Sequence, residues 1–104
     1  MKIADLVFDR RAPGARPEWL AGVFERLVWL LDDNGAEIHS SMRQWIESGD
    51  LERARVALAF TEVYLYQTRP EMVTAFNALC ARFPECRERC IEILARWDSE
   101  PGHG

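Results

Sequence analysis

Apolar residues recur at three- and four-residue spacing between proline and glycine breaks, and no other feature restricts the fold of this chain more. This spacing places the apolar side chains on one face of an α-helix, where they can pack against a core. The clearest stripe lies in residues 17–33 and consists of Leu20, Val23, Phe24, Leu27, Leu30 and Leu31. No stretch shows the alternation of apolar and polar residues that a half-buried strand needs. The sequence therefore predicts an all-α fold.

Prolines mark the starts of several expected helices. Pro17, Pro70 and Pro84 each fit a first helical position, where the missing N–H is tolerated, and each precedes a glutamate that complements the helix dipole. The expected helices span residues 17–33, 36–48, 51–68, 70–82 and 84–97, and residues 1–9 form a further short helix or an extended arm. We expect four or five antiparallel helices in a compact bundle or a single HEAT-like curl.

Two polar segments set further boundaries. The sequence "DDNG" ends the first long helix, with Asn34 or Gly35 in the left-handed conformation of a C-cap. Asp50 is a strong N-cap for the helix expected at 51–68. That helix is apolar on more than one face, through Leu51, Ala54, Ala57, Leu58, Val63, Tyr64 and Leu65. We therefore expect it at the centre of the fold, with neighbours on two sides.

The length of 104 residues suits one small domain. We expect that domain at residues 1–98 and a flexible tail at 99–104. The longest continuous apolar run, residues 27–31, has five residues, far fewer than a membrane span requires. The N-terminal residues have a single Lys and an acid within a short apolar stretch, which is a poor secretion signal. These features predict a cytoplasmic protein that does not enter membranes.

Few residues are placed for chemistry. Glu37, His39 and Ser41 lie two apart on an expected helix and so do not face one another, which favours an ordinary solvent-facing stretch. The odd number of cysteines argues against a disulfide framework and favours reduced thiols packed in the core. A soft metal held by Cys80, Cys86 and Cys90 is the alternative, although a fourth ligand is not evident. We predict no enzymatic activity and no cofactor.

Acidic residues are concentrated in one part of the chain. Residues 18–52 contain eight acids and two bases, a net charge of −6, whereas the whole chain carries −4. Such a surface repels nucleic acid and attracts a basic protein, unless it is only a solvated face. Trp19 and Trp29 fall off the main apolar stripe, and exposed tryptophans often anchor interfaces. The predicted partner-binding residues are Glu25, Trp29, Asp32, Asp33 and Glu37.

The stretch from Trp45 to Trp97 begins "WIESGDLERARVALAFTEVYLYQTRPEMVTAF" and continues into "FPECRERCIEILARW". It resembles the small acidic all-helical immunity proteins of bacterial toxin systems. The likeness covers about half the chain and lies in a Gly-Asp turn that leads into a long apolar helix followed by shorter ones. The resemblance implies a cytoplasmic protein that binds a cognate toxin and blocks it by covering a site.

Three functions follow from these observations. The first is a non-enzymatic protein that neutralises a basic toxin domain through its acidic face. The second is a self-associating structural or adaptor domain, a homodimer formed through the apolar helix at 51–68 and Trp97. The third is a metal or redox function of the three thiols. Charge reversal of Asp32, Asp33 and Glu37 is expected, under the first, to weaken binding without unfolding the chain.

Overall fold

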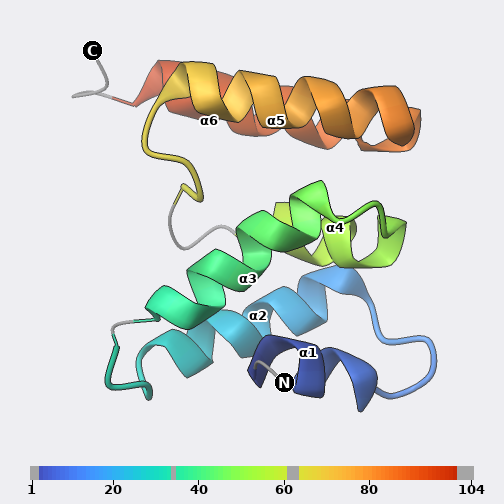
Figure 1. The fold of residues 1–104 in the computed structure, drawn as a ribbon, viewed down its shortest axis with the longest axis vertical. Helices are drawn as coiled ribbons and strands as arrows, with labels where there is room; N and C mark the ends of the chain where they lie inside the picture. The colour runs from blue at the N-terminus through green and yellow to red at the C-terminus, as the bar shows by residue number, and fades with distance from the viewer. Residues whose placement is uncertain (1–2, 34, 61–63, 101–104) are drawn as a thin grey trace.

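The computed structural model describes residues 3–33, 35–60 and 64–100, and these residues form six α-helices and one short 3₁₀-helix without a β-strand. The helices are α1 (Ile3–Asp9), α2 (Pro17–Val28), α3 (Ala36–Glu47), α4 (Leu51–Ala59), α5 (Arg69–Arg82), η1 (Pro84–Cys86) and α6 (Arg87–Ser99), shown in Figure 1. The all-α prediction is confirmed. The number of helices exceeds the four or five predicted, because residues 3–9 form a helix of their own.

The helices α5 and α6 lie side by side as an antiparallel hairpin at one end of the molecule, and α1 and α2 lie at the other (Figure 1). Between them, α3 contacts α1, α2, α4 and α5. A single core of buried apolar side chains runs through all six helices, from Ala4 in α1 to Cys90 in α6. The helix α3 therefore links the N-terminal helices to the C-terminal hairpin.

The central position predicted for the apolar helix is confirmed in α4. This helix packs against both α2 and α3 and buries Val56, Ala57 and Leu58 almost completely. Its N-terminus is capped as predicted, because the Asp50 carboxylate accepts hydrogen bonds from the backbone N–H groups of Glu52 and Arg53.

The predicted extent of this helix, residues 51–68, is wrong. The helix ends at Ala59, and the next residue, Phe60, has an extended backbone with ψ of 109°. Further along, tertiary contacts hold Leu65 and Tyr66 in a non-helical path: Arg43 donates to the Leu65 carbonyl at 3.2 Å, and the Tyr66 hydroxyl donates to Glu47 at 3.2 Å. Val63 of the predicted stripe lies outside the described residues.

The helix predicted at 17–33 is also too long, since α2 ends at Val28. Trp29 and Leu30 continue only as a tightened turn, in which their N–H groups donate to carbonyls three residues earlier. Leu30 was placed on the inward stripe, but 76% of its surface is exposed. The early end of α2 turns Leu30 away from the core.

Gly35 has the predicted left-handed backbone, with φ of 80°. Its predicted role as the C-cap of the preceding helix is wrong, because α2 ends at Val28 with Trp29 as its C-cap, and Gly35 is instead the N-cap of α3. Its backbone lies so close to α2 that an added Cβ would stand 2.7 Å from Cγ1 of Val28. Asn34, the other predicted candidate, lies outside the described residues.

Gly35→Ala is expected to lower the free energy of unfolding by about 2–4 kcal/mol, because the new Cβ meets both a left-handed backbone and Val28. Gly14→Ala is the matched control: Gly14 has nearly the same φ, 79°, but nothing within 4 Å of its added Cβ. Its loss should be about 1–2 kcal/mol. Urea unfolding of both variants tests this, and equal losses would show that the contact with Val28 has no effect.

Residues 3–9, for which the sequence allows either a helix or an extended arm, form a helix. Contacts with α3 and α4 hold this helix in place. The indole Nε1 of Trp45 donates to the Asp5 carboxylate at 3.1 Å. The Arg53 guanidinium lies 3.4 Å from Asp9 and 2.7 Å from Asp50, and it covers the Phe8 ring. These contacts orient α1 and bury Phe8.

The C-terminal hairpin follows the predicted boundaries closely. Proline at the second residue of α5 and at the first of η1 stands near the start of each element, and the expected helix at 84–97 begins as η1 and continues as α6 to Ser99. Residues 101–104 lie outside the described residues, so the predicted flexible tail stays a prediction there. No helix among the described residues is both long and apolar enough to cross a bilayer.

Candidate functional site

The turn between α2 and α3 presents two adjacent large apolar side chains to solvent. Trp29 is 77% exposed and Leu30 is 76% exposed, the highest values among the large apolar residues that the structure describes. Burying two such side chains against a partner would remove a large apolar area from water, a favourable contribution to binding. We call Trp29, Leu30 and Asp32 the turn patch.

The carboxylates predicted for this surface fall into two groups. Asp32 is exposed and makes no hydrogen bond or ion pair within residues 3–33, 35–60 and 64–100. Asp33 instead shapes the turn, because its two oxygens accept from the backbone N–H groups of Gly35 at 2.9 Å and Glu37 at 3.0 Å. Asp33 thereby satisfies a free N–H group of the first turn of α3.

The other two predicted acids lie on the helices beside the turn. Glu37, in the first turn of α3, accepts from the backbone N–H of Ile3 at 3.0 Å, and so it also ties the start of α1 to α3. Glu25 is half-buried on α2, one helical turn before Trp29. Of the five predicted residues, Trp29 and Asp32 are thus the ones whose side chains are both exposed and without a described polar partner.

Leu30 is the residue of this surface that sequence reasoning missed. Its spacing from Leu27 and Leu31 matches an inward helical stripe, so the sequence predicts that the Leu30 side chain faces the core. The only local signal is "DDNG", since Asp and Asn before a glycine favour a turn, but it does not indicate how many residues earlier the helix ends. Trp19 and Trp29, which fall off the predicted apolar stripe, are both exposed, Trp19 to 67%.

Comparison of the chain with protein-family models, curated proteins and solved structures found no match. The resemblance to immunity proteins therefore stays an expectation.

The thiols are packed in the C-terminal part of the core. Cys86 and Cys90 are each 3% exposed, Cys80 is half-buried, and all three are free. Burial raises the pKa of the Cys86 and Cys90 thiols, and the neighbouring Cys80 raises that of Cys90 further. A raised pKa keeps these two thiols protonated, which makes them poor nucleophiles. Within the described part of the chain, no group of His, Cys, Asp and Glu residues is arranged to hold a metal ion.

His39 and Ser41 do not lie on a solvent-facing stretch, contrary to the prediction. Ser41 is 1% exposed and His39 is half-buried, with its ring edge-to-face against Phe60 at 5.7 Å. Burial, and secondarily the Arg43 guanidinium, lower the pKa of His39. His39 Nε2 and Ser41 Oγ have no hydrogen-bond partner among the described residues, so the two side chains do not form a Ser/His pair. The reason is that α3 packs against neighbours on several sides.

Proposed function

We propose that this chain is a non-enzymatic protein-binding module, most concretely a cytoplasmic immunity protein that binds and neutralises a basic toxin domain. The observation that carries the proposal is the turn patch, in which exposed Trp29 and Leu30 stand beside Asp32, whose carboxylate has no partner in the described part of the chain. Large apolar side chains next to an unpaired charge are the composition of a binding anchor and its rim.

The charge of the surrounding surface supports a basic partner. Except for Pro17, the first residue of α2, the helices α2 and α3 and the turn between them lie within residues 18–52. The net charge of these residues is −6. A surface of one sign speeds the encounter with an oppositely charged protein and disfavours nucleic acid. The partner would then bury Trp29 and Leu30 once contact is made.

The homodimer is the alternative, and the structure offers it less support. The apolar residues of α4 that were expected to pair across a dimer are buried against α2 and α3 of the same chain. Trp97 is half-buried and packs edge-to-face on Tyr64 at 4.7 Å. The two candidates differ in their response to salt, because steered binding to a basic partner weakens with ionic strength whereas an apolar dimer barely responds.

Asp32→Lys tests the charge of the turn patch. It should leave the unfolding curve unchanged and weaken binding to the basic partner by about fivefold or more at low salt, an effect that added salt reduces. Asp33→Lys is the comparison: loss of its two backbone hydrogen bonds should lower the free energy of unfolding by about 1–2 kcal/mol. Asp32 is therefore the residue at which we expect charge reversal to weaken binding without destabilising the fold. Unchanged affinity of Asp32→Lys, measured by titration calorimetry, would contradict the role of the acidic face.

A further inference from the structure

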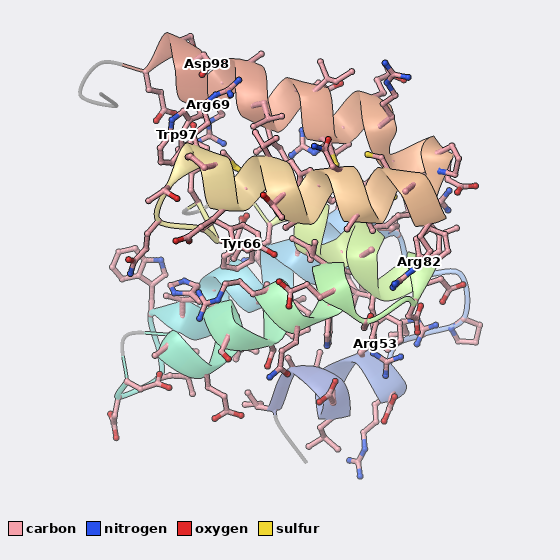
Figure 2. The ribbon with its side chains drawn as sticks, turned by 45° about the horizontal axis from the view of Figure 1, so that its top comes forward. Arg53, Tyr66, Arg69, Arg82, Trp97 and Asp98 are labelled. Carbon is pink, nitrogen blue, oxygen red and sulfur yellow. The ribbon has the colours of Figure 1, made fainter. Side chains whose placement is uncertain are left out.

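A second surface lies at the other end of α3, where the last turn of this helix faces α5. An open cavity of about 580 Å³ runs there, with the face of α5 from Pro70 to Arg82 as one wall and Ile46, Glu47 and Tyr66 as the other. Figure 2 shows Arg69 and Arg82 at opposite ends of α5, with Tyr66 between α5 and α3. We call this cavity the α3–α5 groove.

The middle of the α3–α5 groove is lined by short side chains. Thr74, Ala75 and Ala78 occupy the α5 wall, and Thr74 and Ala78 are exposed. Residues four apart form a ridge on a helix, and short side chains along that ridge allow a second helix to approach closely. The shape suits a helix laid along α5.

Opposite charges stand at the two ends of the groove. Glu71 and Arg82 are eleven residues apart, close to three helical turns, so they share one face and are separated by about 16 Å along the axis. A Cβ added to Gly49 would lie 3.0 Å from Nη1 of Arg82, which places the guanidinium against the turn that follows α3.

Both end charges lack a counter-ion within the described parts of the chain. Arg69, the residue directly before Pro70 at the end of the groove, differs from them, because it forms a double hydrogen bond with Asp98 at 2.8 and 3.0 Å. No ion pair of this kind involves Glu71 or Arg82 among residues 3–33, 35–60 and 64–100. An occupant can therefore pair with both charges without displacing an existing partner.

We propose that the α3–α5 groove binds an amphipathic helix of a partner protein, antiparallel to α5, with an acidic residue in its first turn beside Arg82 and a basic residue in its last turn beside Glu71. This charge order suits the occupant itself, because acids stabilise the N-terminus of a helix and bases its C-terminus. Antiparallel packing also opposes the dipoles of the two helices. Apolar side chains of the occupant helix, at spacing i, i+4 and i+7, contact Ala75, Ala78 and Leu79 of α5. The groove is separate from the turn patch, so the two proposals stand or fall independently.

The test uses a synthetic amphipathic helical peptide of about three to four turns, rich in Ala and Leu, with Glu in its first turn, Lys in its last turn and a nitroxide label at its N-terminus. The peptide is added to the full ¹⁵N-labelled chain. We expect amide shifts along α5 and at Tyr66, and paramagnetic broadening that is stronger near Arg82 than near Glu71. Absence of shifts in the groove at millimolar peptide, or equal broadening at both ends, would overturn the proposal.

Exchanging the charges of the groove should reverse the peptide. In the double variant Glu71→Arg with Arg82→Glu, the broadening should move to the end at residue 71, and broadening that stays at residue 82 would overturn the charge assignment. The control exchanges two exposed charges on α6, Arg87→Glu with Glu88→Arg, and should leave the broadening where it is in the original chain. Should the double variant not fold, Arg82→Gln provides the test, with an expected loss of affinity of about threefold. Unchanged affinity of that variant would count against the proposal.

Discussion

Trp45→Ala is expected to lower the free energy of unfolding by about 3–5 kcal/mol, the largest effect that we predict for a single substitution in this protein. Trp45 is 3% exposed and makes edge-to-face contacts with Phe8 at 5.3 Å and Phe24 at 5.6 Å. Removing the indole leaves a cavity between α1, α2 and α3, and it also removes the donor that binds the Asp5 carboxylate. Urea unfolding followed by far-ultraviolet circular dichroism measures the loss.

Trp19→Ala is the matched control, since the same side chain is removed from a site that is 67% exposed. Its free energy of unfolding should change by about 0.5 kcal/mol or less. Trp45→Phe separates the hydrogen bond from the packing: it keeps an aromatic ring between Phe8 and Phe24 but has no N–H for Asp5, and a loss of about 1–2 kcal/mol is expected. A stability of Trp45→Ala equal to that of Trp19→Ala would refute the central role of this side chain.

Trp29→Ala is expected to weaken binding of the basic partner by about thirtyfold or more, which corresponds to about 2 kcal/mol. The indole is 77% exposed in the free protein and would be buried on binding beside Leu30. Because it contacts little in the free chain, its removal should leave the unfolding curve within about 0.5 kcal/mol of the original. Titration calorimetry with the partner recovered by co-purification measures the affinity, and denaturation checks the fold.

Trp19→Ala is also the control for binding. Trp19 lies in the first turn of α2 and Trp29 follows the last turn, so the two residues are about 15 Å apart along the helix axis. The control should bind as the original chain does. An equal loss of affinity in both variants would show that the partner contacts the whole of α2. If both variants instead kept the original affinity, Trp29 would not be the anchor. Together with Asp32→Lys, these variants separate the apolar part of the turn patch from its charge.

Helix starts could be predicted from local residues, because the groups that determine them lie next to one another in the chain. Asp50 caps α4 through N–H groups two and three residues ahead, and Pro17 stands at the first residue of α2. Helix ends were predicted less well. Nothing near Phe60 prevents a helix locally, and α4 stops there in a structure where Arg43 and Glu47 of α3 hold Leu65 and Tyr66 in a non-helical path.

The residues of the candidate site likewise divide into those whose position could be predicted from the sequence and those whose position could not. Exposure of Trp29 could be predicted, since the sequence shows that it lies off the apolar stripe of the helix. The exposure of Leu30 and the local role of Asp33 could not, because both depend on α2 ending at Val28 and on the path of the turn into α3. The α3–α5 groove was not predicted at all, because Ile46 and Glu47 of α3 lie more than twenty residues before the α5 wall and only packing brings them together.

The sequence by itself determined the all-α class, the helix starts, the left-handed turn at Gly35 and the concentration of acids in residues 18–52. Each of these depends on periodicity, composition or contacts between near neighbours in the chain. Tertiary structure decided where α2 and α4 end, which carboxylates are engaged and which remain available, and where a groove opens. Most of these depend on contacts between residues far apart in sequence, and at Phe60 such contacts outweigh the local helical preference.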